Sequence, residues 1–205
     1  MSSVNTKAKL VLSGVGGQGL MLVAKLLGDT CLRAEIPITS LEDHGMSQRG
    51  GAIGVRIQFG NNKGLDFQPG QADVIIALEP MEATRHAHYL KENGVVVVDT
   101  TPINPLTISM DKDREYPPIE DLLAPFKQVK AKVLQINARQ QAKELGETRA
   151  ANVVMLGAAV AFDVLPVTKE QMEETLRSVL PPRIVDVNLR AFQKGWELGK
   201  ASLST

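Results

Sequence analysis

The stretch KAKLVLSGVGGQG, residues 7–19, decides the fold of this chain. Residues 7–13 form a short apolar run that stops at a cluster of glycines, and we interpret this run as a buried strand. Apolar residues then recur every three to four positions over residues 20–33, which predicts a helix. Glycines between a strand and a helix allow a tight turn whose N–H groups can contact a phosphate. A turn without a ligand is the alternative. The predicted contacts are Gly14, Gly16, Gly17, Gln18 and Gly19.

The rest of the chain predicts alternating strands and helices. Further strands are expected at residues 36–41, 52–59, 74–78, 95–98 and 132–136. Further helices are expected at residues 81–90, 138–145, 152–162, 168–180 and 184–198. The proline-rich residues 101–127 are expected to form a loop. Unbroken apolar runs such as VVVV at 95–98 are typical of strands buried on both faces. We therefore predict one α/β domain over residues 1–205, an open doubly wound, mainly parallel sheet with helices on both faces and a C-terminal helical segment.

Composition excludes several classes of protein. Lys plus Arg and Asp plus Glu each number 23, and the absence of a basic surplus argues against nucleic-acid binding. The chain has one cysteine, Cys31, whereas an iron–sulfur cluster normally takes four thiolates, so this chain alone is not expected to hold a cluster. No metal site is predicted. The start lacks a signal-peptide core, and no apolar run reaches the roughly 18 residues of a membrane span. We expect a cytoplasmic protein without a membrane partner.

A second glycine-rich stretch, EDHGMSQRGG at residues 42–51, follows a predicted strand. The carboxyl ends of strands are where ligands bind in open α/β folds. Arg49 offers a planar fork for phosphate or carboxylate, and Ser47 and Gln48 add neutral donors. The alternative is a surface loop with a surface ion pair. His44 is a candidate proton carrier, for which a hydrogen bond that fixes the loop is the alternative role.

The two glycine-rich stretches together resemble the small subunit of the indolepyruvate:ferredoxin oxidoreductases, within the pyruvate/ketoisovalerate oxidoreductase gamma-domain family. LGETRAANVVMLGA at residues 145–158 extends the resemblance, which covers roughly residues 9–160. The sequence HGMSQRGG at residues 44–51 resembles the indolepyruvate branch of this family.

The resemblance implies that a 2-oxoacid, coenzyme A and oxidised ferredoxin give an acyl-CoA, carbon dioxide and reduced ferredoxin. It also implies that a large partner subunit carries thiamine diphosphate, magnesium and [4Fe-4S] clusters, and that ferredoxin acts through the complex. This chain would then bind no cofactor alone and supply no catalytic residue. We hypothesise that residues 14–19 and 47–49 form one anion-binding edge that faces the partner and contacts coenzyme A.

Two other functions stay open at this point. A stand-alone NAD(P)-dependent oxidoreductase would use the first glycine turn, with Glu42 or Asp43 to hold the ribose hydroxyls. Only Tyr89 and Tyr116 are available as catalytic tyrosines, and neither lies in a Tyr-x-x-x-Lys array. A non-catalytic nucleotide-binding regulator would also explain the glycine loops.

Overall fold

A six-stranded sheet organises the chain in a computed structural model that describes residues 7–44, 51–61, 64, 66–104 and 115–204. The strands lie in the order β2-β3-β1-β4-β5-β6, and β3 runs in the opposite direction to the other five. The mainly parallel sheet predicted from the sequence is therefore confirmed. The strand bounds are β1 Ala8–Val15, β2 Ile38–His44, β3 Ala52–Phe59, β4 Ala72–Ala77, β5 Leu90–Asp99 and β6 Lys132–Ile136.

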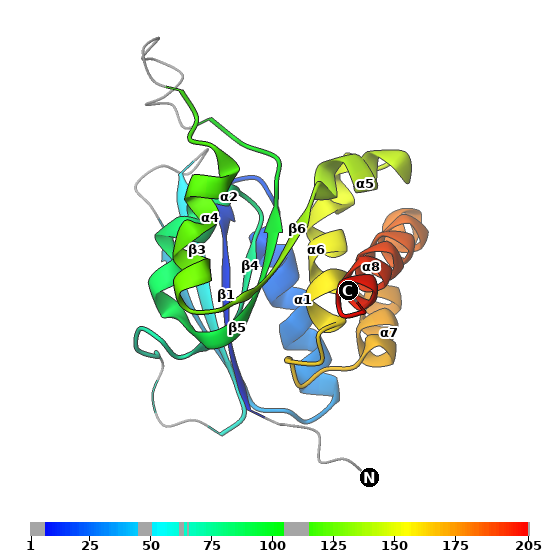
Figure 1. Ribbon diagram of the computed structural model, residues 1–205. Helices are drawn as coiled ribbons and strands as arrows, with labels where there is room; N and C mark the ends of the chain where they lie inside the picture. The colour runs from blue at the N-terminus through cyan, green and yellow to red at the C-terminus, as the bar shows by residue number, and fades with distance from the viewer. Residues whose placement is uncertain (1–6, 45–50, 62–63, 65, 105–114, 205) are drawn as a thin grey trace.

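Helices cover both faces of this sheet, as Figure 1 shows. One face carries α2 (Pro80–Arg85), η1 (Ala87–Tyr89) and α4 (Ile119–Gln128). The other face carries α1 and α6, with α7 and α8 packed outside them and α5 at the upper end. The bounds on this second face are α1 Leu20–Arg33, α5 Ala138–Glu144, η2 Thr148–Ala150, α6 Ala151–Val160, α7 Lys169–Val179 and α8 Pro182–Ser202.

The four valines of β5 show why the central strands read as unbroken apolar runs. Side chains alternate between the two faces of a strand. Val95 and Val97 belong to the core under α1 and α6, whereas Val96 and Val98 belong to the core under α2 and α4. Both faces of β5 are covered, so each position requires an apolar residue.

The prediction of a loop over residues 101–127 was wrong at its C-terminal end, where α4 begins at Ile119. Leu122, Leu123 and Phe126 point inward from this helix and are buried. Pro118 is its N-cap, and Pro125 lies inside it. The density of prolines concealed the apolar spacing, although proline is tolerated where tertiary packing holds the helix.

Two other elements end at different residues from those predicted. The helix expected at residues 81–90 ends at Arg85 and gives way to a 3-10 turn, because the chain must enter β5 at Leu90. Strand β2 runs on to His44, so that Glu42 and Asp43 lie within the sheet instead of after it. The capping box at Thr168 and Gln171 is present at the start of α7.

Helices α6 and α8 touch backbone to backbone. A Cβ at Gly195 would lie 1.8 Å from the carbonyl oxygen of Val154, and a Cβ at Gly157 would lie 2.1 Å from that of Phe192. Glycines at these positions let the helix axes approach more closely than any side chain would allow. Helix α6 is consequently enclosed between the sheet and α8, with nine of its residues buried.

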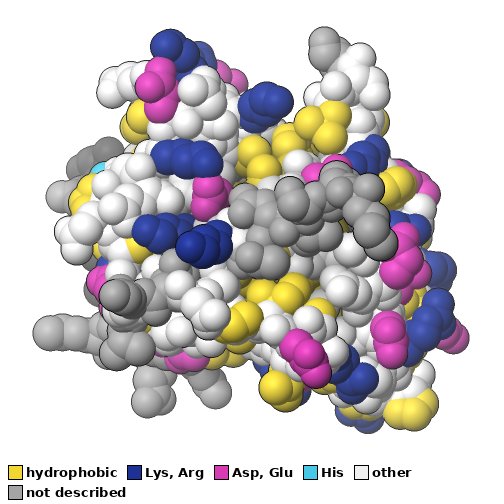
Figure 2. Space-filling view, turned by 90° about the horizontal axis from the view of Figure 1, so that it is seen from below, with side chains coloured by type: hydrophobic (Ala, Val, Ile, Leu, Met, Phe, Trp, Pro, Cys, Tyr) yellow, Lys and Arg dark blue, Asp and Glu magenta, His cyan; other side chains and the backbone are white. Residues whose placement is uncertain are grey.

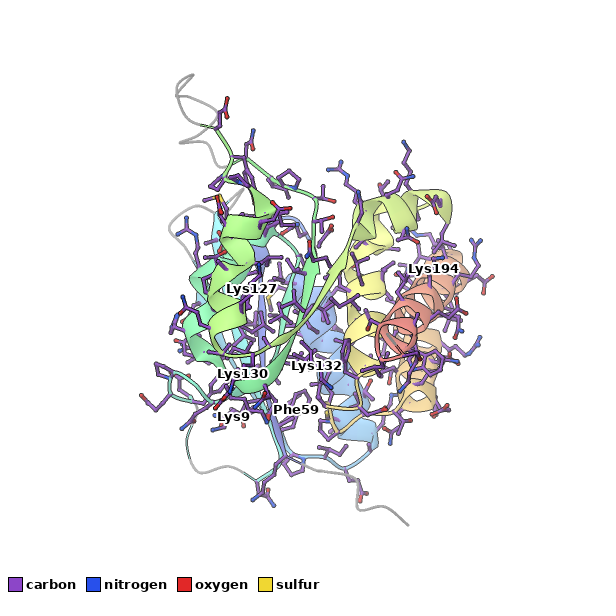
Figure 3. The ribbon with its side chains drawn as sticks, viewed as in Figure 1. Lys9, Phe59, Lys127, Lys130, Lys132 and Lys194 are labelled. Atoms are coloured by element: carbon purple, nitrogen blue, oxygen red, sulfur yellow. The ribbon has the colours of Figure 1, made fainter. Side chains whose placement is uncertain are left out.

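The amino end of the sheet carries charges of both signs, which Figure 2 shows side by side. Figure 3 labels Lys9 and Lys130 at this end. Lys130 is paired with Glu92 at 2.8 Å, and the ammonium of Lys9 donates to the Gln71 side-chain oxygen at 2.6 Å. Each of these two lysines therefore has a polar partner on the protein itself. Among the described residues, no helix is long and apolar enough to cross a membrane.

Replacing Gly195 with alanine should destabilise the protein strongly, because the new methyl group would overlap the α6 backbone. Overpacking of this kind lowers the free energy of unfolding by about 3 kcal/mol, which corresponds to roughly 6–12 °C in melting temperature for a chain of this size. Thermal unfolding followed by circular dichroism measures the change.

Gly28→Ala is the matched control. Gly28 also lies inside a helix, but a Cβ there meets nothing within 4 Å. Alanine should raise the stability at this position by about 0.5–1 kcal/mol. Equal melting temperatures for the two variants would contradict the close contact of α6 with α8.

Candidate functional site

The first glycine turn joins β1 to α1 at the carboxyl edge of the sheet. Gly17 and Gly19 adopt positive φ values of 99° and 81°, which favour glycine because a Cβ is strained there. Gln18 holds the turn in shape: its side-chain oxygen accepts from the Val15 N–H at 2.8 Å, and its amide nitrogen donates to the Leu78 carbonyl. Both polar groups of Gln18 are thus used within the protein.

Asn152 connects this turn to α6. Its side-chain nitrogen donates to the Gly19 carbonyl oxygen at 3.0 Å. This contact also explains Gly19, since a Cβ there would lie 2.3 Å from the same nitrogen. Asn152 is 4% exposed, and its Oδ1 has no hydrogen-bond partner among the described residues. The sequence does not indicate this role: an asparagine before an apolar helix predicts an N-cap, but the N-cap is Ala150.

The second glycine stretch connects β2 to β3 and ends beside the first. The Gly16 N–H donates to the Gly51 carbonyl at 2.9 Å, because β3 pairs with β1 along its whole length. Ser47, Gln48 and Arg49 lie outside the described residues. The backbone of His44 pairs with Ile53 at the end of β2, and the role of its side chain stays a prediction.

A pocket of about 550 Å³ opens at this edge of the sheet. The start of α1 and the start of α6 both contribute to it. Helix N-termini favour anions because their first N–H groups have no intrahelical partner, although the first N–H of α6, on Ala151, donates to the Thr148 carbonyl. Two arginines that the sequence analysis did not select, Arg139 and Arg149, also line it. The lining residues are Val15, Gly16, Gly17, Gln18, Gly19, Leu22, Leu78, Asp99, Thr101, Ile103, Arg139, Thr148, Arg149, Ala151 and Asn152.

Asp99 forms the buried floor of this pocket. Its carboxylate accepts from the N–H groups of Thr101 at 3.0 Å and Ala138 at 3.3 Å. Burial raises the pKa of Asp99, whereas these hydrogen bonds and the positive charge of Arg139 lower it. The carboxylate at the end of β5 therefore shapes the chain around the pocket.

Glu79, at the end of β4, fixes the other wall. It caps α2 by accepting from the Glu82 N–H at 3.0 Å, and it also accepts from the Ile103 N–H at 3.3 Å. The Tyr116 hydroxyl donates to the same carboxylate, and burial, together with this hydrogen bond, raises the pKa of Tyr116. One carboxylate thereby holds both Ile103 and Tyr116 close to the end of β4.

The cysteine content of this chain argues against an iron–sulfur cluster held by this chain alone. Cys31, its one cysteine, is fully buried on α1, and burial raises the pKa of its thiol to about 11. In the described part of the chain, no group of three or more His, Cys, Asp or Glu side chains is placed to hold a metal ion.

A family comparison identifies the chain. Residues 9–198 match the family model of pyruvate ferredoxin/flavodoxin oxidoreductase. The chain belongs to this family.

Relatives of known name agree with this assignment. The chain is 37% identical over 196 residues to the indolepyruvate oxidoreductase subunit IorB of Thermococcus kodakarensis, covering 95% of this chain and 96% of that one. It is 29% identical over 199 residues to the 2-oxoglutarate synthase subunit KorC of Methanocaldococcus jannaschii, covering 96% of both chains. Each match spans nearly the whole length of the relative.

Solved structures share the fold. The gamma subunit of a keto/oxoacid ferredoxin oxidoreductase from Geobacter sulfurreducens PCA is 28% identical, with a TM-score of 0.71 over 95% of this chain and 99% of that one. A 2-oxoglutarate:ferredoxin oxidoreductase from Magnetococcus marinus, solved with 2-oxoglutarate, coenzyme A and succinyl-CoA bound, is 22% identical with the same TM-score. This chain covers 32% of that larger chain.

These findings confirm that the chain is the small subunit of a 2-oxoacid:ferredoxin oxidoreductase of this family. The NAD(P)-dependent and regulatory alternatives are not supported. The sheet gives a physical reason against the first: β3 lies between β1 and β2, so the end of β2 is two strand spacings, roughly 10 Å, from the first glycine turn. Asp43 is moreover paired with Arg56 at 2.7 Å.

The stability of the protein should depend on the protonation of Glu82. Burial raises the pKa of Glu82 from 4.5 to about 7, with Arg85 lowering it and Glu79 raising it further. The folded chain then keeps a proton that the unfolded chain releases, so stability falls as pH rises from 4.5 to 7. Glu82→Gln should be more stable than the parent above pH 7, by on the order of 1–3 kcal/mol.

Urea unfolding midpoints at several pH values measure this effect. Glutamine resembles the protonated carboxyl, so the variant should show a shallower fall between pH 4.5 and 7. An unchanged slope would contradict the buried environment described for Glu82.

Proposed function

We propose that this chain, as a single domain of 205 residues, is the small subunit of an indolepyruvate:ferredoxin oxidoreductase. Four curated relatives that share 33–37% of their residues with it over 89–95% of the chain bear the indolepyruvate name. The 2-oxoglutarate synthase subunits are more distant, at 25–29% identity. The HGMSQRGG stretch supports the same branch.

The complex would oxidise a 2-oxoacid with coenzyme A, releasing carbon dioxide and passing two electrons to ferredoxin while the acyl group forms a thioester. The large partner would carry thiamine diphosphate, magnesium and the [4Fe-4S] clusters. The single buried cysteine of this chain supports that division, because a cluster normally needs four thiolates.

The contribution of this chain would be part of the coenzyme A site. The observation that carries this proposal is the pocket at which the glycine turn, two helix N-termini and two arginines converge. Backbone N–H groups and helix N-termini bind phosphate without a charged side chain. The predicted contacts on the second loop, Ser47, Gln48 and Arg49, would extend this site, since Gly51 lies against Gly16.

A reconstitution experiment tests the overall function. The purified chain is combined with its large partner, and reduction of ferredoxin is followed with indolepyruvate and coenzyme A, with 2-oxoglutarate as the competing substrate. We expect activity only with both chains present and a preference for indolepyruvate. Activity of this chain alone, or a preference for 2-oxoglutarate, would refute the proposal.

Gly17→Ala should weaken coenzyme A binding in the reconstituted complex. A Cβ at Gly17 meets nothing within 4 Å, so the change adds backbone strain and a methyl group at the pocket wall. The methyl group would keep a phosphate from close contact with the turn. A loss of about 1.4 kcal/mol of binding free energy corresponds to a tenfold rise in the KM for coenzyme A, while that for the oxoacid stays nearly constant.

Gly70→Ala is the control for this variant. Gly70 also has a positive φ, 74°, and open space at its Cβ, but it lies before β4 at the opposite end of the sheet. It should impose the same kind of strain without a change in either KM. Equal effects of the two variants would show that Gly17 acts only through stability.

Arg49→Ala should likewise raise the KM for coenzyme A more than that for the oxoacid, because a guanidinium is the strongest phosphate donor in the second loop. Steady-state kinetics of the complex measure both constants. Unchanged coenzyme A kinetics would remove Arg49 from the site.

A further inference from the structure

The pocket is wider than the glycine turn that forms one side of it. Its lining includes a residue at or just after the end of each of β1, β4 and β5, and Arg139 follows β6. These four strands are neighbours in the sheet, so the pocket extends across three strand spacings, roughly 14 Å. A ligand that fills it can be held by separate groups on its two sides.

Arg139 and Arg149 both supply positive charge to the pocket lining, and Arg139 does so from the β6 side, away from the glycine turn. Arg149 is engaged by Glu147, with its Nη2 at 2.7 Å and its Nε at 2.9 Å from the two carboxylate oxygens. Arg139 is exposed and makes no hydrogen bond or ion pair within the described part of the chain. Its guanidinium is thus the one of these two that is available to a ligand.

The positive charge of Arg139 lowers the pKa of the buried Asp99 carboxylate, but no hydrogen bond or ion pair joins these two side chains. Asp99, the carboxylate nearest in the pocket lining, already accepts from two backbone N–H groups. Asn152 lies at the opposite side, where it is tied to the Gly19 carbonyl. The pocket therefore presents backbone donors at one side and a free guanidinium at the other, which suits a ligand with negative charge in two separate places.

We propose that Arg139 binds the 3′-phosphate of coenzyme A while the glycine turn receives its diphosphate. This inference rests on the proposed function, in which the pocket takes coenzyme A. Coenzyme A carries its 3′-phosphate on the ribose, apart from the diphosphate. A planar guanidinium can meet such a terminal phosphate with two parallel hydrogen bonds.

Arg139→Gln in the reconstituted complex tests the assignment, with coenzyme A and 3′-dephospho-coenzyme A as alternative substrates. Dephospho-coenzyme A lacks only the group that Arg139 would contact. The KM for coenzyme A should rise at least tenfold, since the variant loses the charge-assisted hydrogen bonds to the 3′-phosphate, while the KM for dephospho-coenzyme A and both kcat values stay unchanged. Lys143→Gln removes the same charge from an exposed site on α5 outside the pocket lining and should change neither constant.

The two possible failures are distinguishable. If Arg139→Gln changes the two KM values equally or not at all, while Gly17→Ala raises both, Arg139 does not read the 3′-phosphate but coenzyme A still binds the pocket. If Gly17→Ala also leaves both KM values unchanged, coenzyme A does not bind there and the proposed function of the pocket is overturned with the assignment of Arg139.

Discussion

The enclosure of α6 is the constraint on which the rest of the structure depends. This helix packs against the sheet on one side and against the α8 backbone on the other, where glycines allow contacts that no side chain would permit. Close packing on all sides leaves the helix no freedom to shift. Its first turn carries Asn152, which holds the Gly19 carbonyl. The position of the first glycine turn is therefore set by a helix that is far from it in sequence.

The chemistry of the site follows from a division between backbone and side chains. The glycine turn offers N–H groups, while the carboxylates of Glu79 and Asp99 are buried and accept hydrogen bonds from the chain around them. These two carboxylates hold the chain around the pocket in place. Their negative charge is used in hydrogen bonds with backbone N–H groups of the protein. Positive charge stands at the rim on Arg139 and Arg149. Such an arrangement is suited to an anionic ligand, as the proposed function requires.

Sequence reasoning succeeded where a single periodicity decided the outcome. The apolar runs predicted β4, β5 and β6, helical spacing predicted α1 and the amphipathic α8, and the capping box of Thr168 and Gln171 predicted the start of α7. It failed where tertiary contacts outweighed local signals: Leu122, Leu123 and Phe126 are buried within a helix despite Pro125. It also missed Arg139, because nothing local distinguishes an arginine at the start of a short helix from a solvated one. Its place in the pocket follows from β6 being third from β1 in the sheet.

The antiparallel strand β3 links fold and function. In a dinucleotide-binding sheet the strand after the first helix pairs directly with the first strand, and its terminal acid reaches the ribose. Here β3 occupies that position, between β1 and β2. Its place in the sheet has two consequences. The acids at the end of β2 are displaced from the glycine turn, with Asp43 drawn into a pair with Arg56. Gly51, the residue before β3, lies against the turn instead, where its carbonyl accepts from the Gly16 N–H. A glycine pattern shared with nucleotide-binding proteins thus lies in a sheet whose strand order removes the ribose contact and places Gly51 beside the turn instead.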